Sequence, residues 1–209
     1  MTGVRTNQGE IQAPVVINAA GIWGDRIGRM AGVEVPLTIC RHKINFFARP
    51  AGAREPHPLV YDFVKNIYTR PETGGLTLVG LLDAEEVNDR VDPDHYNEGV
   101  SFEETADAME RAAHRFPVME QGEVARGYAG CFDVTPDWHP IMDQAGPEGS
   151  YVAVGFSGHG FKLSPAVGHM MAALVTEGPG GHPDLPAFRL SRFAEGKPIR
   201  GTYGDWLMG

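Results

Sequence analysis

The clearest pattern of hydrophobic and polar positions in this chain is a strand, a glycine-rich turn and a helix between residues 151 and 178. Tyr151 to Val154 form an apolar, β-favouring run, and three glycines follow within six residues. Ser164 as a cap, Pro165 at the first helical position and Gly178 as a stop predict a helix that begins near Ser164. Its apolar residues recur at helical spacing: Val167, Met170, Met171, Leu174 and Val175.

The turn and the start of this helix suit an electron-rich ligand. A helix N-terminus presents unpaired N–H groups and the positive end of the helix dipole. Glycines before it let a ligand approach the backbone without hindrance from a Cβ. A glycine turn alone is more often only a tight connection between a strand and a helix.

A second strand, turn and helix is predicted near the start of the chain. Residues 15–17 read as a buried strand that leads into the small residues 18–21. A helix is expected over about residues 22–31, with Gly32 as its stop. Residues 3–13 before it are typical of a hairpin that turns at Asn7-Gln8-Gly9.

The middle of the chain has the pattern of an antiparallel or mixed sheet followed by a helix. Runs of β-favouring residues alternate with turns rich in Pro and Gly. Ser101 and Glu104 form a capping box before a helix that reaches about Arg115. The predicted strands cover residues 39–48, 59–62, 66–70 and 75–82.

The composition of the chain limits the kinds of binding partner that are expected. The formal net charge is −9 and the Lys and Arg residues do not cluster, which argues against nucleic acid. No apolar run approaches the ~18 residues of a membrane span, and the start lacks the features of a signal peptide, so a cytoplasmic protein without a membrane partner is expected. Cys40 and Cys131 lie far apart, the histidines are scattered, and no metal is assigned.

Three segments together resemble the FAD-dependent amine and amino-acid oxidoreductases, the family that includes D-amino acid oxidase. They are GFSGHGFKLSPAVG at 155–168, VVINAAGIWGDRIGRMAG at 15–32, and TPD followed by HPIMD from Thr135 to Asp143. The likeness is strongest to the branch of sarcosine oxidase and dimethylglycine dehydrogenase. Agreement of separate motifs in the correct order makes this far more specific than a glycine turn alone.

The resemblance implies a mixed α+β fold. Residues 1–37 and 125–209 would form part of an FAD-binding domain, and residues 38–124 a substrate domain with an antiparallel or mixed sheet. The activity implied is oxidation of a C–N bond in a small amino acid or N-methylated amine by hydride transfer to flavin.

The resemblance also implies a set of site residues. Lys162 would bind both the cofactor and the substrate carboxylate, and Tyr68 and Phe132 would be walls of the substrate cavity. No catalytic acid or base is assigned. The cofactor-binding residues would be Ala20, Gly21, Trp23, Gly158, His159, Gly160, Phe161 and Lys162.

Three departures from the family pattern matter. No GxGxxG loop for the FAD pyrophosphate is present, so we expect an incomplete enzyme or a subunit whose partner chain supplies that loop. Thr77 stands where sarcosine oxidase has a lysine that activates dioxygen, which leaves oxidase and dehydrogenase both open. Cys131 is one residue out of register with the family's flavin-linking cysteine, so noncovalent FAD is expected.

Two other interpretations stay open. One is a non-catalytic fragment or subunit that binds no flavin. The other, less favoured, is an α/β-hydrolase with Ser157 as nucleophile. Its GxSxG motif is broken here, because His159 stands in place of the second glycine.

Overall fold

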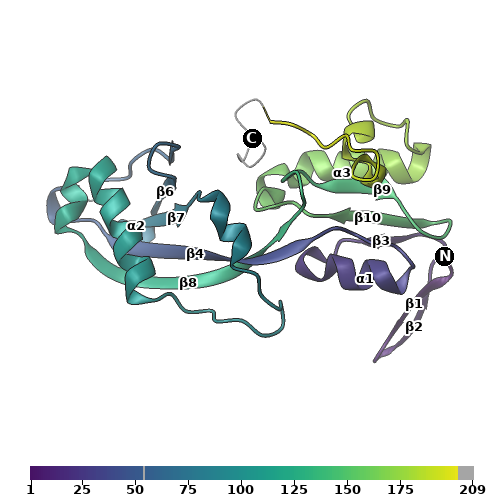
Figure 1. Ribbon diagram of the computed structural model, residues 1–209, viewed down its shortest axis with the longest axis horizontal. Coiled ribbons are helices and arrows are strands. Elements are labelled where there is room, and N and C mark those ends of the chain that lie inside the picture. The colour runs from purple at the N-terminus through teal and green to yellow at the C-terminus, as the bar shows by residue number, and fades with distance from the viewer. Residues whose placement is uncertain (54, 202–209) are drawn as a thin grey trace. The chain divides into compact units, whose positions relative to one another are not determined.

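A computed structural model describes residues 1–53 and 55–201 of the chain (Figure 1). The chain divides into two compact units, one made of Met1–Ile39 and the residues from Phe132 onward, the other of Cys40–Cys131. The sequence-based division instead places its boundaries after residues 37 and 124. Residues 202–209 of its last segment lie outside the described residues.

The first unit is built on a three-stranded mixed sheet in the order β3-β10-β9. These strands are β3 (Val16–Asn18), β9 (Ile141–Gln144) and β10 (Ser150–Val154). β10 runs parallel to β3 and antiparallel to β9. The parallel pairing places the ends of β3 and β10 at the same edge of the sheet.

Helices cover both faces of this sheet (Figure 1). Tyr151 and Ala153 share a buried cluster with Met170, Met171 and Leu174 of α3 (Gly160–Glu177). The alternate residues of β10 face the other way, where α1 (Gly24–Met30) lies after a 3₁₀ turn at Gly21–Trp23. A Cβ on Gly24 would be 2.7 Å from Val154 Cγ1, so the absence of a side chain lets α1 approach the sheet.

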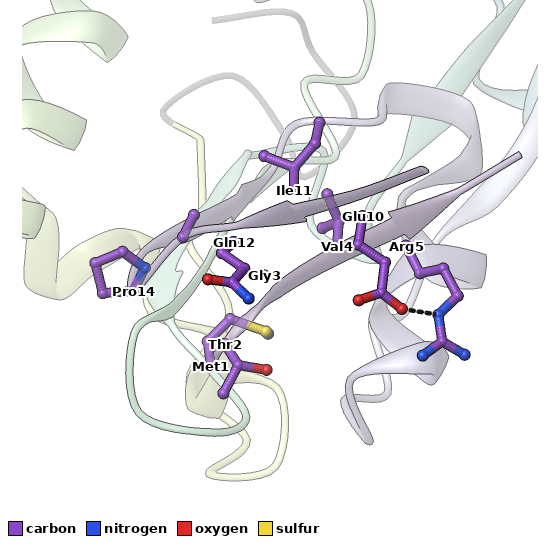
Figure 2. A pocket seen from close by; sticks show the side chains of 10 residues that line it. Met1, Thr2, Gly3, Val4, Arg5, Glu10, Ile11, Gln12 and Pro14 are labelled. Atoms are coloured by element: carbon purple, nitrogen blue, oxygen red, sulfur yellow. Dashed lines mark hydrogen bonds and ion pairs between the residues drawn. The ribbon is translucent and has the colours of Figure 1, made fainter. Parts of the chain in front are cut away.

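A solvent-exposed hairpin precedes the sheet. It pairs β1 (Gly3–Thr6) with β2 (Gly9–Gln12), as the sequence predicted. Figure 2 shows the ion pair between Arg5 and Glu10 that joins the two strands, with 2.7 Å between Arg5 Nε and Glu10 Oε1. A hollow of about 650 Å³ lies along this hairpin, and none of the predicted site residues lines it.

The second unit has a five-stranded sheet in the order β5-β6-β7-β4-β8. β4 (Thr38–Ala48) pairs antiparallel with β7 (Leu76–Leu81), β7 with β6 (Ile67–Glu72), and β6 with β5 (Val60–Asp62). β8 (Glu123–Val134) forms the other edge. β4 and β8 each contain residues of both units.

Helix α2 (Phe102–Arg115) packs on one face of this second sheet. Ala108 and Ala112 are fully buried against Phe47, Ile67 and Val79. Small residues at these helix positions let α2 lie close to the strands. The predicted capping box is present: Glu104 N–H donates to Ser101 Oγ, and Ser101 N–H donates to the Glu104 carboxylate.

The predicted mixed α+β fold class is confirmed, with antiparallel pairing from β5 to β4 in the second unit and a mixed sheet in the first. None of the helices in the described part of the chain combines the length and apolar character that crossing a bilayer requires. Within residues 1–53 and 55–201, no three His, Cys, Asp or Glu side chains gather closely enough to hold a metal ion.

Two predictions about elements are wrong. α3 begins at Gly160 rather than near Ser164, with His159 as N-cap, so Pro165 lies in its second turn and leaves one backbone carbonyl without its helical donor. Its end at Gly178 is as predicted. The strand at 15–17 is not buried: Val15 and Ile17 are 38% and 44% exposed, because β3 lies at an edge of its sheet.

Candidate functional site

Two turns meet at one edge of the first unit's sheet. β3 leads into residues 19–21 and β10 into residues 155–158, and Val152 of β10 is in register with Asn18 of β3. Because the strands are parallel neighbours, both turns leave the same edge. In open α/β sheets, this carboxyl edge is where ligands bind.

The turn after β10 has an unusual backbone. Gly155, Ser157 and Gly158 all have positive φ, at +75°, +49° and +85°. Glycine adopts this conformation freely, but for a serine it costs roughly 1 to 2 kcal/mol. The turn therefore depends on neighbouring groups that hold it.

The end of β8 supplies those groups. Gly155 N–H donates to Asp133 Oδ2 at 2.7 Å, and Ser157 N–H donates to the Asp133 carbonyl at 3.2 Å. Thr135 N–H donates to Ser157 Oγ at 3.3 Å, and that hydroxyl donates to the Gly155 carbonyl at 3.2 Å. Burial raises the pKa of the Asp133 carboxyl, while the N–H groups of the turn oppose that rise.

Phe132, predicted as a wall of the substrate cavity, lies against this turn. A Cβ built on Gly158 would be 2.8 Å from two atoms of the Phe132 ring, so the ring covers the glycine backbone directly. Any side chain at position 158 would displace it. Phe132 thus contacts a residue that we predicted to bind the cofactor.

His159 is buried at the start of α3. The residue is 5% exposed, and its Nε2 has no hydrogen-bond partner among the described residues. Burial, together with the nearby charges of Lys162 and His139, lowers the pKa of His159 to about 4. The imidazole is therefore neutral at physiological pH and can donate or accept one hydrogen bond at Nε2.

The first turn of α3 is open to solvent. Phe161 is 97% exposed, and the side chains of Lys162 and Leu163 are also exposed. Gly160 sits against Phe156, whose Cβ would be 3.1 Å from a Cβ at position 160. The N–H groups at this helix start, beside the ammonium of Lys162, form an electropositive edge.

The neighbouring turn is held by one side chain. Asn18 Nδ2 donates to the Gly24 carbonyl at 2.8 Å, and Ala20 N–H donates to Asn18 Oδ1 at 3.2 Å. Gly21 has φ +53°, and a Cβ there would meet nothing within 4 Å, so glycine serves the backbone conformation and leaves the space above it open. Trp23 follows and is 42% exposed.

A buried ion pair that was not predicted from the sequence lies beside this edge. Arg192 is fully buried, and its Nε and Nη2 donate to the two Asp137 oxygens at 2.8 and 2.9 Å. Asp137 also accepts the N–H groups of His139 and Ile199. Burial raises the pKa of Asp137, but the hydrogen bonds from Arg192 and the backbone more than offset this and hold it below its usual value. Asp137 belongs to the TPD motif, whereas nothing in the sequence around Arg192 indicates burial.

Tyr68 lies in the second unit, within a buried hydrogen-bonded chain. His42 Nδ1 is 2.6 Å from Glu86 Oε2, and its Nε2 is 3.1 Å from the Tyr68 hydroxyl. Burial, and next the charge of Glu86, raise the pKa of Tyr68 far above its usual value. A carboxylate, an imidazole and a phenol in this order can store or pass a proton. Of these three residues only Tyr68 was predicted from the sequence, because His42 and Glu86 belong to separate segments.

Thr77 and Cys131, singled out by the family resemblance, have ordinary local environments. Thr77 is 2% exposed, and its hydroxyl lies 2.9 Å from His57 Nε2. Cys131 is a half-buried free thiol whose pKa is raised, mainly by burial. Thr77 has no amine with which to take the role of the family's lysine.

Ser157 has the wrong surroundings for a hydrolase nucleophile. Its side chain is fully buried, and both hydrogen bonds of its hydroxyl are to the backbone of Gly155 and Thr135. A nucleophile must be accessible and paired with a base. These contacts disfavour the hydrolase interpretation.

The edge fits a flavin. The ring's pyrimidine side carries carbonyl oxygens and develops negative charge on reduction, which suits the open N–H groups of α3. The buried Nε2 of His159 lacks a polar partner among the described residues, and the open space at Gly21 allows a flat ligand to approach the backbone. The fit concerns the ring and not the pyrophosphate, for which no glycine loop is present.

Comparison with known proteins agrees with this geometry. A family model described as FAD dependent oxidoreductase matches residues 1–174. Human mitochondrial sarcosine dehydrogenase is 31% identical over 199 residues, which cover 92% of this chain and 21% of that protein. Monomeric sarcosine oxidase from Bacillus sp. (strain NS-129) is 30% identical, with 91% of this chain and 50% of that protein covered.

Solved structures give the same picture. L-proline dehydrogenase from P. horikoshii superposes with a TM-score of 0.82 at 27% identity, over 95% of this chain and 52% of the other. Glycine oxidase from Geobacillus kaustophilus gives a TM-score of 0.74 at 25% identity, over 92% and 50%. The chain thus spans about half the length of sarcosine oxidase and about a fifth of sarcosine dehydrogenase.

Proposed function

Because this chain belongs to the FAD-dependent oxidoreductase family, we propose that it forms the later half of a flavoenzyme that oxidises a C–N bond of a small amino acid or N-methylated amine. The family's cofactor is FAD. Relatives named for sarcosine, proline and glycine support a small amine substrate that carries a carboxylate. When bound, FAD would accept a hydride from the carbon beside the substrate nitrogen.

The observation that carries this proposal is the exposed start of α3 beside the two glycine turns. Gly21 would let the flavin approach the backbone, Gly158 and Gly160 would contribute backbone N–H groups to its site, and the N–H groups of α3 would stabilise negative charge on it. His159 would meet the ring with a neutral imidazole, and Lys162 would bind the substrate carboxylate through a charge-assisted hydrogen bond. The remaining proposed contacts with the cofactor are Ala20, Trp23 and Phe161.

Tyr68 is the residue of the second unit that we propose for the substrate, with its hydroxyl hydrogen-bonded to His42. The amine must be neutral before hydride leaves, and a phenol hydrogen-bonded to an imidazole can orient that amine. Phe132 would contribute apolar surface beside Gly158.

We further propose that sequence outside these 209 residues supplies the pyrophosphate loop, either in the same protein or in a partner chain. The absence of a GxGxxG motif and the half-length match to sarcosine oxidase support this. A second candidate function, that of a non-catalytic subunit, rests on the same absence. Noncovalent FAD is favoured, because Cys131 is one residue out of register with the family's attachment point and a shift of one residue turns a strand side chain to the opposite face.

A visible absorbance spectrum of the purified chain, before and after acid precipitation, tests the proposal. Flavin bands that move to the supernatant on precipitation support noncovalent FAD binding. Flavin retained in the pellet would overturn the noncovalent assignment and point to Cys131. A colourless protein that gains no thermal stability with added FAD would favour the non-catalytic alternative.

A further inference from the structure

The backbone between β10 and α3 has a strained position at Ser157. Three of the four residues from Gly155 to Gly158 have positive φ, and one of them, Ser157, carries a side chain. Such conformations persist only where the surroundings determine them. The contacts that hold this turn therefore set where α3 starts and where its N–H groups point.

Those contacts come from one short segment, Phe132 to Thr135, at the end of β8. The Phe132 ring covers Gly158, the Asp133 carboxylate accepts Gly155 N–H, and Thr135 is hydrogen-bonded to Ser157. A Cβ on Gly155 would lie 2.3 Å from Thr135 Cγ2, so the packing is tight as well as hydrogen-bonded. We refer to these contacts as the turn network.

Within the turn network, Asp133 makes two contacts at once. It is 8% exposed, its carboxylate takes the N–H of the first residue of the turn, and its own carbonyl takes the N–H of the third. A buried carboxylate is costly unless backbone donors satisfy it, and a buried N–H is costly unless it has an acceptor. Each group therefore requires the other, which fixes the turn relative to the end of β8.

We propose that Asp133 is a positioning residue for the flavin: it holds the Gly155–Ser157 turn and, through that turn, the α3 N-terminus against which the ring would lie. This inference rests on the proposed function only where the test measures FAD binding or the flavin spectrum. Its structural part concerns the backbone of this chain alone.

The test compares D133N with a matched control, D143N. The amide side chain of D133N keeps the shape of the carboxylate but loses the charge and one acceptor oxygen. Asp143 also accepts backbone N–H groups, from Gln144 and Leu190, but takes no part in the turn network. The measurements are amide hydrogen exchange of the full chain, FAD titration, and the absorbance spectrum of bound flavin.

D133N should speed exchange of the Gly155 amide by about tenfold or more, weaken FAD binding about tenfold, and shift the long-wavelength flavin band at saturating FAD. D143N should leave all three unchanged. A purely structural role for Asp133 would lower thermal stability without moving the flavin band, and it would overturn the proposal. So would exchange of the Gly155 amide at the wild-type rate.

If D133N does not fold, S157A tests the same network from the other side. It should speed exchange at Thr135 and leave Gly155, whose acceptor is Asp133, protected. Loss of protection at Gly155 in S157A would contradict the proposal. If wild-type chain binds no FAD, the proposed function fails, while the exchange experiment still decides the role of Asp133.

Discussion

At the scale of single residues, His159 combines burial with a group that can titrate. Its folded pKa of about 4 is depressed below its usual value, so the folded protein binds fewer protons than the unfolded chain between roughly pH 4 and 6.5. The stability that this neutral imidazole contributes is present above pH 6.5 and is lost as the pH falls to 4.

We therefore expect wild type to lose ~1–3 kcal/mol of unfolding free energy relative to H159Q between pH 7 and pH 4. Urea unfolding at several pH values measures this difference. H169Q is the matched control, because His169 lies outside the buried start of the same helix, and it should follow wild type. Parallel curves for wild type and H159Q would show that the pKa of the buried imidazole is not depressed.

Two glycines in the same segment should respond in opposite directions to alanine. At Gly158, φ is +85° and a Cβ would meet the Phe132 ring at 2.8 Å, so G158A should destabilise the chain by roughly 1 to 3 kcal/mol. At Gly168, inside α3, a Cβ would meet nothing, so G168A should stabilise it by about 0.5 to 1 kcal/mol. Chemical denaturation compares both with wild type, and equal effects would contradict the contacts described for Gly158.

At the scale of elements, the ion pair between Asp137 and Arg192 joins the segment after α3 to the turn that follows β8. Removing one member of a buried pair leaves an unpaired charge, so R192M should cost roughly 3 to 5 kcal/mol. R189M removes a solvent-accessible pair with Glu195 and should cost far less, because water and salt screen an exposed ion pair. If the urea midpoints of the two variants are nearly equal, the buried pair contributes no more to stability than the accessible pair does.

Most elements could be predicted from the sequence, because their signals are local. The capping box of Ser101 and Glu104, the apolar spacing in α3 and the turn at Asn7-Gln8-Gly9 each lie within a few residues. The start of α3 was predicted too late because Pro165 was placed at the first helical position, although the residues before Ser164 are also compatible with a helix. The exposure of β3 was missed because periodicity does not report whether a strand lies at an edge.

The candidate site was predictable only in part. Gly21, Gly158 and the other motif residues follow from the resemblance, but their supports come from distant positions. Asp133 lies 22 residues from the turn that it holds, and Arg192 lies 55 residues from Asp137. Contacts of this kind depend on tertiary structure, and no local sequence pattern predicts them.

At the scale of the whole molecule, three motifs spread over the chain led to a family assignment that the comparisons confirm. Ligand binding should be visible in global stability, since a ligand that binds only the folded protein stabilises it. FAD at about 100 times its dissociation constant should raise the unfolding free energy by about 2.7 kcal/mol. Calorimetry with FAD measures this increase, and riboflavin is the control that distinguishes recognition of the ring from binding of the whole dinucleotide. If neither ligand stabilises the chain, the proposal that it binds flavin is contradicted.

The exposed strand β3 has a practical consequence at the bench. Among the described residues it pairs only with β10, so its outer edge has no neighbouring strand, and Val15 and Ile17 at this strand are partly exposed. Such an edge recruits strands from neighbouring molecules as the concentration rises. Concentrated samples should therefore precipitate. Co-expression of a polypeptide that pairs with β3 should keep the protein in solution, so the soluble fraction would report whether a candidate polypeptide binds this edge.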